Sequence, residues 1–420
     1  MTAGSRATPR SLLVISQVYP PDPAAVGQHC ADVAEEMVRR GWRVSVTTAA
    51  RGYDDPSAVY PRRETRAGVE VRRLPWSSFG KQSIARRLVA QTLFAVQAVA
   101  RALFASAPDV ILASTSPPFA GFFATLLARL RGVRLVWWVM DLNPDQMVAA
   151  GRIAPTSLAA RVFDWMNRVT LRRSDVVIAL DDFMRDRVLA KHDVGGRMHV
   201  VPPWPTTDDV DFAPNAGGRF RREHGLDDAF VVMYSGNHAL QHPLDTLLAA
   251  AADLAAEAGL RFVFVGGGAG KAAVDAAVAA GSPAILSLPY QPLESLAESL
   301  SAADIHVVTM GDDMVGIIHP CKIYGALAAG RPILFFGPEE SHVGRIVRDF
   351  GVGWHVRHGD VAGARAAIRA ARGMPAEARR ALGERARAVA ESRFARSRSL
   401  GAVCDLVERE PTRTGSRRDG

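Results

Sequence analysis

Cysteine is scarce in this sequence, which holds three in 420 residues. Cys30, Cys321 and Cys404 lie far apart and show no metal-binding spacing, and their odd number does not indicate a disulfide framework. A disulfide-stabilised secreted domain and a cysteine-based zinc module are therefore excluded. So few thiols are typical of a reducing compartment, and we expect the protein in the cytoplasm.

Long hydrophobic runs are absent as well. No segment reaches the roughly 18 uninterrupted apolar residues that a membrane-spanning helix needs. The apolar residues 12–15 follow a short polar start and are too few for the core of a signal peptide. We interpret them as a first strand, and we expect no spanning helix.

Acidic residues are outnumbered by basic ones, 43 against 51, which gives a formal charge of +8. A basic surface suits nucleic acid, anionic lipid or phosphorylated substrates. No compact basic and aromatic cluster and no zinc-finger spacing is present, so we expect no nucleic acid partner. With 48% hydrophobic and 22% charged residues the composition is that of a globular protein, and the length suggests two domains.

Strand-like and helix-like segments alternate along almost the whole chain, the pattern of parallel sheets flanked by helices. Two series of strands are separated by residues 202–225, which are rich in Pro, Asp, Asn and Gly. We predict two doubly wound α/β domains facing across a cleft, with ligands at the carboxyl ends of the strands. The predicted strands are 12–16, 44–48, 110–113, 135–139, 176–179 and 199–201, then 231–234, 262–265, 284–286, 305–308 and 333–336.

The segment 311–332 carries the strongest functional signal. It follows an apolar strand, opens with turn-forming Gly and Asp, and continues into a helix that begins near Pro320 and ends at Gly330. Lys322 falls in the first turn of this helix, where a cation opposes the helix dipole and is a poor structural choice. Backbone N–H groups and a mobile cation at a helix start suit a diphosphate, so we predict Lys322 as its partner.

Three neighbours of Lys322 are further candidates. His319 could donate to a phosphate or sugar oxygen, or could simply pack beside the following proline. Gly316 and Ile317, in the loop before the helix, are predicted contacts of the same ligand.

Residues after two other strands of the second series are also candidates. Gly236 allows a ligand to approach the backbone closely, and Asn237 or His238 can hydrogen-bond a phosphate, although a plain strand-to-helix turn would read the same way. Tyr290 follows a strand, and its ring could stack on a flat ligand while backbone groups of Gln291 contact the edge of that ligand. The alternative is a packing role for an aromatic ring between two prolines.

The glycines at 266, 267 and 268 do not form a phosphate loop. Val265 stands where the first glycine of that motif belongs, and Ala272 replaces the required Ser or Thr. We predict Gly266, Gly267 and Gly268 as a floor beneath the nucleotide, against the alternative of a flexible connector.

The first domain offers fewer candidates. Asp141 follows the strand 135–139, so its carboxylate should face the cleft and could accept or orient the proton of an acceptor hydroxyl. The alternative is a turn cap. Gly27 and Gln28 form a second plausible anion-facing loop at the start of a helix, which a helix cap would explain equally well.

The segment 79–108 contains no acidic residue. It carries Lys81, Arg86, Arg87 and Arg101 beside an apolar face. Such a helix could lie on an anionic membrane and bring the protein to a polyprenyl-linked acceptor. The alternative, a domain helix buried along one face, is the reading we prefer slightly.

Seven motifs in register over residues 11–405 resemble bacterial family-4 glycosyltransferases of the GT-B fold, particularly the branch used in lipopolysaccharide, capsule and exopolysaccharide assembly. The motifs are Tyr19-Pro20-Pro21 with Gly27, residues 140–144, 232–238, 264–268, 303–306, 319–324 with 329–332, and 351–354. The resemblance implies transfer of a sugar from a nucleotide-sugar to an acceptor hydroxyl. It implies a nucleotide site in the second domain, an acceptor site in the first, a last helix that crosses back to the first domain, and no metal or other cofactor.

Two features depart from the family pattern. Ile317 and Gly325 stand where the family has paired glutamates, and the loop 237–242 lacks the usual Arg and Lys. The chain is therefore either a divergent branch in which Lys322 and histidines take over, which we favour, or a protein that has lost catalysis.

We therefore predict a metal-independent hexosyltransferase that uses a nucleotide-sugar, preferably a UDP-sugar, and a lipid-linked or polysaccharide acceptor. It would work in the cytoplasm, with peripheral contact to the inner membrane face as an option. The alternatives are a nucleotide-sugar epimerase of the same fold and a non-catalytic scaffold. The predicted boundaries are 11–205 for the acceptor domain, 206–390 for the nucleotide domain, 391–410 for the crossing helix, and 1–10 and 411–420 for disordered tails.

Overall fold

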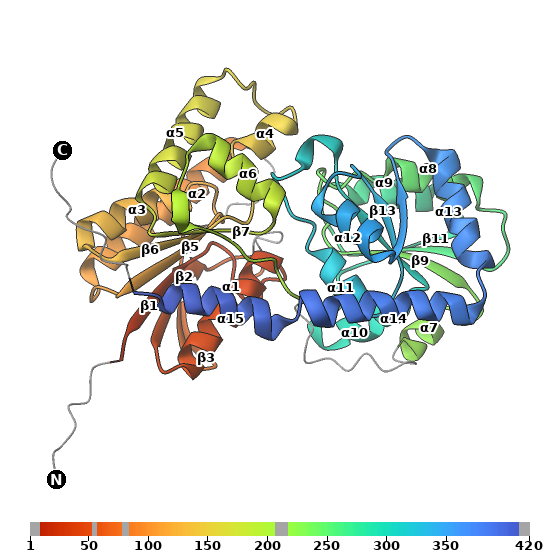
Figure 1. Cartoon of the computed structure of the whole chain (residues 1–420), viewed down its shortest axis with the longest axis horizontal. Coiled ribbons are helices and arrows are strands. Elements are labelled where there is room, and N and C mark those ends of the chain that lie inside the picture. Colours follow the sequence, from red (N-terminus) through yellow and green to blue (C-terminus); the bar gives the residue numbers. More distant parts are fainter. Residues whose placement is uncertain (1–8, 53–56, 78–83, 206–216, 411–420) are drawn as a thin grey trace, which may run out of the picture.

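A computed structural model describes residues 9–52, 57–77, 84–205 and 217–410 and folds them into two α/β halves (Figure 1). The first half contains an eight-stranded sheet in the order β3-β4-β2-β1-β5-β6-β7-β8. The second contains a six-stranded sheet in the order β11-β10-β9-β12-β13-β14. Every strand pair in these sheets is parallel except β3–β4, which is antiparallel. The predicted class of two doubly wound parallel sheets is confirmed.

The elements of the first half alternate as its sequence predicts. Its strands are β1 (Ser11–Ile15), β2 (Arg43–Ala49), β3 (Arg63–Arg66), β4 (Val69–Leu74), β5 (Val110–Ser114), β6 (Arg134–Trp138), β7 (Val176–Ala179) and β8 (Met198–Val200). Its helices are α1 (Ala25–Arg39), α2 (Ile84–Phe104), α3 (Ala120–Arg131), α4 (Asp145–Ala149), α5 (Leu158–Arg173) and α6 (Asp182–Lys191), with a 3₁₀ turn η1 (Gly195–Arg197).

The second half has the same alternation. Its strands are β9 (Phe230–Ser235), β10 (Leu260–Val265), β11 (Ile285–Leu288), β12 (Ile305–Thr309), β13 (Ile333–Phe336) and β14 (Gly353–Val356). Its helices are α7 (Gly218–Glu223), α8 (Asp245–Asp253), α9 (Lys271–Ala279), α10 (Leu296–Ser301), α11 (Lys322–Ala328), α12 (His342–Phe350), α13 (Val361–Gly373), α14 (Ala376–Arg393) and α15 (Arg396–Glu408), with 3₁₀ turns η2 (Leu293–Ser295) and η3 (Asp312–Met314).

The central strands form because their residues are apolar on both faces. β1, β5 and β12 are buried along their full length, as expected for parallel strands covered by helices on both sides. β3, β4 and β14 were not predicted. β3 is largely exposed and charged, β4 contains a glutamate and two arginines among its apolar residues, and β14 is only partly buried, so none of them carries a continuous apolar run.

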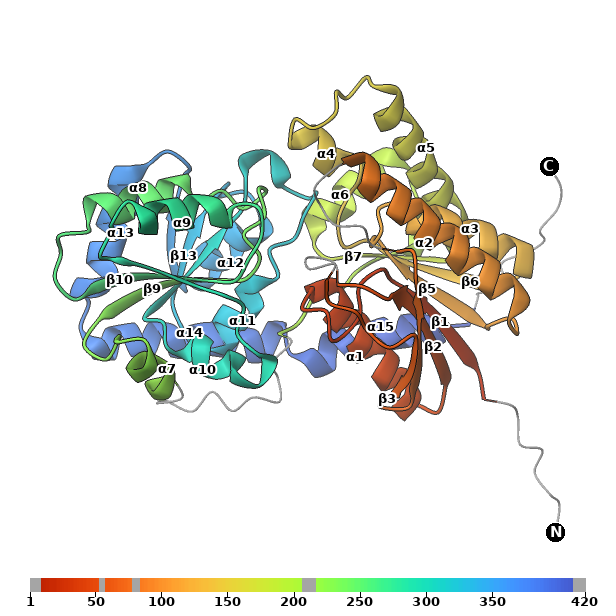
Figure 2. The same ribbon diagram turned by 180° about the vertical axis from the view of Figure 1, so that it is seen from behind.

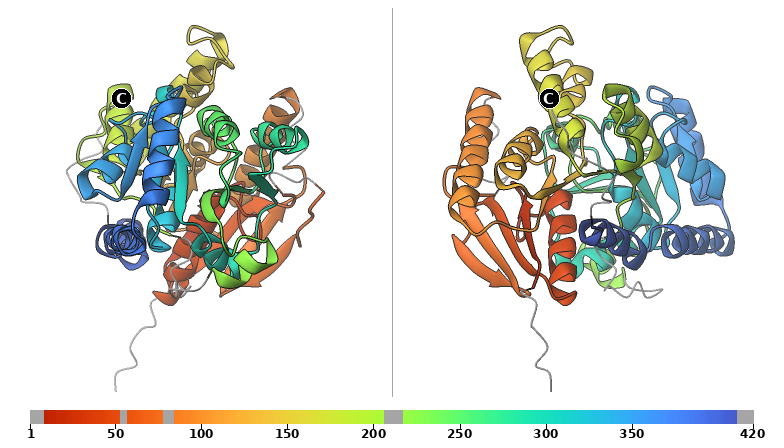
Figure 3. Two further views of the ribbon diagram at one scale, coloured as in Figure 1. Left: turned by 90° about the vertical axis from the view of Figure 1, so that its right-hand side faces the viewer. Right: turned by 60° about the vertical axis from the view of Figure 1, so that its left-hand side comes forward.

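The last two helices run along one side of both halves (Figures 1 and 3). α14 packs on α11 of the second half, and α15 packs on α1 of the first. Arg134 of the first half donates to the carbonyls of Leu406 and Val407, at 2.7 and 2.8 Å. The crossing helix predicted over residues 391–410 is divided between the end of α14 and α15, which are separated by Phe394 and Ala395.

The predicted amphipathic helix corresponds to α2, and Phe79 and Lys81 of that prediction lie outside the described residues. The side chains of Arg86 and Arg87 are not described either. Across the ranges that the structure describes, none of the helices has the length and apolar character needed to cross a bilayer.

Candidate functional site

Loops from both halves meet at the carboxyl ends of their sheets. The Leu142 N–H, after β6, donates to the Ile317 carbonyl, after β12, at 2.8 Å. Arg187 of α6 donates to the Val315 carbonyl at 2.6 Å. We call this region the interdomain site. It comprises the residues that follow β6, β9, β10, β11 and β12, namely Asp141, Gly236–His238, Gly266–Gly268, Tyr290 and residues 316–322.

Lys322 begins α11 and points toward the end of β9. Its Cε lies 3.3 Å from where a Cβ on Gly236 would stand, and its ammonium lies 5.1 Å from the ring centroid of Tyr234. Among the described residues the ammonium has no ion pair and no hydrogen bond. Burial lowers the pKa of Lys322 to about 8, although the Cys321 thiolate acts in the opposite direction. Because α11 has only seven residues, the positive charge at this site comes mainly from the ammonium rather than from the helix dipole.

The loops after β9 and β10 are joined by their backbones. The His238 N–H donates to the Gly267 carbonyl, and the Gly270 N–H donates to the His238 carbonyl, each at 2.7 Å. This interlock makes one rigid surface beside Lys322, not a flexible connector.

The same interlock explains several of the glycines. A Cβ on Gly266 would lie 2.1 Å from the Gly236 carbonyl oxygen, and one on Gly268 would lie 2.3 Å from Asn237 Oδ1. Gly236, Gly266 and Gly268 also have φ values between 123° and 131°, which side chains rarely adopt. Packing therefore requires these glycines whether or not a ligand contacts them, and their predicted contact with a nucleotide stays a prediction.

Two histidines lie near Lys322, and both are neutral. The ring of His238 is fully buried against Tyr234, at 4.8 Å between centroids, and its pKa is lowered to about 4 by burial and by the charges of Lys271 and Lys322. His242 Nδ1 lies 2.7 Å from the Thr309 carbonyl, and burial holds its pKa well below the usual range. The buried ring of His238 supports the loop from beneath, which differs from the predicted phosphate contact.

Tyr290 lies at the rim of this surface. Its side chain is 37% exposed, and its hydroxyl lies 3.4 Å from the Gly267 carbonyl. Burial raises the pKa of Tyr290, and Asp22 of the first half adds to the rise. The Gln291 amide donates back to the Pro289 carbonyl at 3.1 Å. One face of the Tyr290 ring thus borders the site, in a position suited to stacking.

Asp141 stands on the first half, directly after β6. Its N–H donates to Thr115 Oγ1 at 3.0 Å, while its carboxylate has no hydrogen-bond or ion-pair partner among the described residues. Burial raises the pKa of Asp141 to about 6, against the opposing charge of His319. Burial and the Asp141 charge together raise the pKa of Cys321, which places the carboxylate close to the start of α11. Asp141 on the first half and Lys322 on the second thus each bring to the interdomain site a charged group without a hydrogen-bond or ion-pair partner among the described residues.

His319 does not lie free beside Lys322. Its Nδ1 is 2.7 Å from Asp181 Oδ2, and its Nε2 is 2.7 Å from the Tyr324 hydroxyl. Both ring nitrogens are engaged and the side chain has no exposed surface. The predicted direct contact with a phosphate or sugar is therefore corrected: His319 is a buried residue that connects the two halves.

Gly316 and Ile317 face the first half. A Cβ on Gly316 would lie 2.5 Å from the Phe183 carbonyl oxygen, and the Ile317 side chain is only 2% exposed. Because the Ile317 carbonyl already accepts from Leu142, this loop holds the halves together and is not open to a ligand. Beside Gly325, the other position of the missing glutamates, Leu300 lies 3.3 Å from a Cβ position.

Gly27 and Gln28 lie in the first turn of α1, and both contact the loop that precedes this helix. A Cβ on Gly27 would lie 3.0 Å from the Tyr19 backbone nitrogen, so a larger residue would push the helix off the loop before it. The Gln28 amide donates to the Asp22 carbonyl at 3.1 Å and holds that loop. Their predicted role toward an anion stays a prediction.

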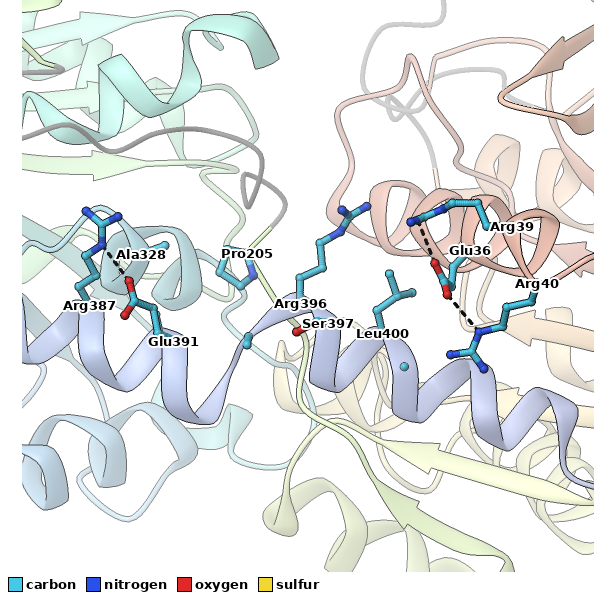
Figure 4. A pocket seen from close by; sticks show the side chains of 13 residues that line it. Glu36, Arg39, Arg40, Pro205, Ala328, Arg387, Glu391, Arg396, Ser397 and Leu400 are labelled. Atoms are coloured by element: carbon cyan, nitrogen blue, oxygen red, sulfur yellow. Dashed lines mark hydrogen bonds and ion pairs between the residues drawn. The ribbon is translucent and has the colours of Figure 1, made fainter.

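A second hollow of about 560 Å³ lies away from this site, where α1, α14 and α15 meet (Figure 4). We call it the hinge groove. Its arginines are paired with acids: Arg40 with Glu36, at 3.1 Å, and Arg387 with Glu391, at 3.0 Å. It is lined by Glu36, Arg39, Arg40, Pro205, Ala328, Arg387, Ala390, Glu391, Ala395, Arg396, Ser397, Leu400 and Gly401.

No cluster of three or more His, Cys, Asp or Glu side chains able to hold a metal occurs within the described ranges. The charged groups available at the interdomain site are those of Lys322 and Asp141.

Comparison with known proteins assigns the chain to a class. Residues 24–204 match the glycosyl transferase 4-like domain family. The chain is 24% identical over 352 residues to the probable glycosyltransferase WbjE of Pseudomonas aeruginosa, covering 82% of this chain and 85% of the relative. It is 25% identical over 352 residues to the putative colanic acid biosynthesis glycosyl transferase WcaI of Escherichia coli (strain K12), covering 81% and 86%.

Solved structures share the fold over nearly the whole chain. WaaG, a glycosyltransferase involved in lipopolysaccharide biosynthesis, matches with a TM-score of 0.71 at 16% identity, covering 94% of this chain and 99% of that one. HepE of Anabaena, in complex with UDP and glucose, matches with a TM-score of 0.70 at 14% identity, covering 95% and 99%.

Two facing parallel-sheet domains of this kind define the GT-B class of glycosyltransferases. The chain has that fold, its residues 24–204 match the glycosyl transferase 4-like domain, and it is a distant homologue of the glycosyltransferases WbjE and WcaI.

Several residues that organise the site escaped the sequence analysis. Asp181 looks like an ordinary helix cap, and it does cap α6 by accepting from the Met184 N–H at 2.8 Å. Tyr324 and His342 look like core residues of short helices. The Asp181–His319 contact joins residues 138 positions apart, and no local pattern signals such a pair.

Proposed function

We propose that the protein transfers a hexosyl group from a UDP-sugar to a hydroxyl of a lipid-linked or polysaccharide acceptor in cell-surface glycan synthesis. The observation that carries this proposal is that each half brings to the interdomain site one charged side chain without a partner among the described residues, Lys322 on the second half and Asp141 on the first. The donor would lie on the side of Lys322 and the acceptor on the side of Asp141.

The departing diphosphate gathers negative charge as the bond to the sugar breaks. A fixed cation that already faces this position stabilises the transition state without having to reorganise, and such preorganised electrostatics is usually the largest catalytic term. Lys322 meets that requirement because no acid among the described residues neutralises it. The proposal assigns this neutralisation to Lys322 and to backbone N–H groups, without a metal ion.

Asp141 is suited to the acceptor hydroxyl. A general base works best with a pKa near the working pH, and burial brings the pKa of Asp141 to about 6. Its carboxylate is thus mostly ionised at neutral pH and only weakly solvated. The side chain would accept the hydroxyl proton or orient the hydroxyl toward the sugar.

The choice of UDP rests on two supports. HepE, which shares the fold, was crystallised with UDP and with UDP-glucose. In this chain Tyr290 presents a partly exposed ring beside Gly267 at the rim, where a flat base could stack.

A lipid-linked acceptor is supported by exposed apolar side chains on one face of the first half. α2, α3 and α5 lie side by side there (Figure 2). Each of these helices has large apolar side chains exposed on its outer side, and α3 and α5 also carry several arginines. The exposed set is Val89, Val96, Leu103 and Phe104 of α2, Leu126 and Leu130 of α3, and Leu158, Val162 and Trp165 of α5. We propose that this face rests on the inner, cytoplasmic surface of an anionic membrane.

Vesicle sedimentation tests the membrane contact. Leu130→Glu with Trp165→Glu should reduce binding to vesicles with anionic lipid at least tenfold. Val278→Glu, an equally apolar exposed position on α9 of the other half, is the matched control and should bind like the native protein. Equal binding of both variants would refute the contact.

Donor binding and transfer are tested in two steps. Thermal shifts with UDP, GDP and TDP should show UDP stabilising most, by about 2.7 kcal/mol at a hundredfold excess over its dissociation constant. Radiolabelled UDP-sugar is then incubated with and without a lipid extract. Label in lipid supports the transferase. Isomerised sugar formed without an acceptor would instead support the epimerase alternative. If the protein neither binds nucleotide nor releases sugar, the non-catalytic scaffold is supported.

A further inference from the structure

Four polar side chains form a continuous buried line from one half to the other. Asp181 Oδ2 contacts His319 Nδ1 at 2.7 Å, His319 Nε2 contacts the Tyr324 hydroxyl at 2.7 Å, and that hydroxyl contacts His342 Nε2 at 3.0 Å. Asp181 belongs to the first half, and the other three belong to the second. We call this line the interdomain relay.

Asp181 sets the first proton of the relay. Its carboxylate can only accept, so His319 Nδ1 carries a proton. The Tyr324 hydroxyl then lies between His319 Nε2 and His342 Nε2, at 2.7 and 3.0 Å. The hydrogen bond and charge of His319 lower the pKa of Asp181 to about 2 against the opposing effect of burial, so the carboxylate stays ionised.

The relay is tied to structural elements at both ends. Asp181 uses its other oxygen, Oδ1, to cap α6. The Tyr324 ring packs edge-on against Phe394, at 5.0 Å between centroids, where α14 gives way to α15. The relay therefore joins the N-cap residue of α6, the helix that carries Lys322, and the point where the chain crosses between the halves.

His319 is separated from Lys322 by two residues only. Its backbone carbonyl accepts from the Cys321 N–H at 2.9 Å, so the position of His319 fixes the turn from which Lys322 projects. Removing one partner from a buried, charge-assisted pair leaves the other unsatisfied, so the line holds only when both halves are in place.

We propose that Asp181 is a positioning residue. Through His319 it holds the turn before Lys322 against the first half, and this contact keeps the Lys322 ammonium and the Asp141 carboxylate in fixed positions relative to each other. This inference rests on the proposed function. It assigns to His319 no contact with substrate.

Asp181→Asn is the informative variant, because asparagine keeps the volume and the oxygen that caps α6 but loses the charge that fixes the His319 proton. We expect kcat to fall 10- to 100-fold while the dissociation constant for UDP changes less than threefold. Tyr324→Phe, which keeps the ring, should show the same split to a smaller degree.

Asp360→Asn is the matched control. Asp360 caps α13 by accepting from Gly363, and it lies outside the relay. This variant should keep native kcat and UDP affinity. An unchanged kcat in Asp181→Asn, or a loss of UDP affinity equal to the loss of kcat, would overturn the inference.

A measurement without turnover separates this inference from the proposed function. Spin labels at exposed Ala159 of α5 and Ala273 of α9, in a Cys321→Ser background, report the distance between the halves. Asp181→Asn should broaden or lengthen the distance distribution, whether or not any sugar is transferred, while Asp360→Asn should not. Identical distributions in the three proteins would refute the relay even if the enzyme transfers sugar as proposed.

Discussion

The interdomain site and the hinge groove both contain charged side chains from the two halves, but these charges are paired in the groove and unpaired in the interdomain site. In the groove Arg40 is paired with Glu36, Asp405 and Glu408, at 2.7 to 3.1 Å. In the interdomain site Lys322 and Asp141 have no partner among the described residues, and burial shifts the pKa of each toward neutrality.

This difference distinguishes charges that hold the structure from charges held ready for a ligand. Paired arginines at a surface groove contribute modestly to stability, and their charges are already neutralised by neighbouring carboxylates. An unpaired, partly buried charge costs stability, and proteins retain it mainly where function requires it. We therefore interpret the hinge groove as structural and the interdomain site, with its unpaired charges, as the functional site.

The largest effect should come from Asp141→Asn. Losing the base should lower kcat by on the order of 10³, with little change in UDP affinity, because the residue faces the acceptor. Steady-state kinetics with UDP titration checks this. Arg387→Met in the groove should stay within twofold of the native kcat, and comparable losses in both variants would erase the distinction between the regions.

Lys322→Ala should follow, with kcat/KM for the donor lowered by on the order of 10². The thermal shift caused by UDP should shrink with it, since the same charge contacts the diphosphate before and during transfer. Lys322→Arg should recover part of both losses. Native affinity for UDP in Lys322→Ala would place the diphosphate elsewhere.

The pH profile of kcat/KM sharpens the comparison further. Asp141 must be ionised, so the rate should rise about tenfold per pH unit below a limit near 6; Lys322 must be charged, so it should fall with the same slope above a limit near 8. Asp141→Asn should abolish the acidic limb and keep the basic one. A flat profile between pH 5 and 9 would exclude both assignments.

The smallest effects concern stability and have opposite signs in the two regions. Burial lowers the folded-state pKa of Lys322 from 10.5 to about 8, so the charged lysine destabilises the fold below pH 8, and this cost fades as the pH rises toward 10.5. Lys322→Met should therefore raise the free energy of unfolding at pH 7 by about 1–2 kcal/mol, with a smaller gain at pH 10. Arg40→Met should lower it by about 1–2 kcal/mol at both pH values. Urea denaturation measures both, and a loss of stability in Lys322→Met would contradict the idea of an uncompensated charge.

Much of this could be predicted from sequence because it is local. Apolar runs mark the buried parallel strands, and residues such as Asp141 and Lys322, which follow them, fall at the sheet edge where ligands bind. The edge strand β3 escaped because exposed charged residues carry no such pattern. His319 was open to two interpretations, since only the folded chain shows that Asp181 occupies its ring nitrogen. Gly266 and Gly268 look like ligand-facing glycines, yet contact with a neighbouring loop is sufficient to require them.

Pro205 and Arg396 both line the hinge groove, so the chain's outward passage and its return lie next to each other (Figure 4). Because both crossings lie at one place, the covalent chain holds the halves together there, and the contacts of His319, Leu142 and Arg187 hold them at the interdomain site.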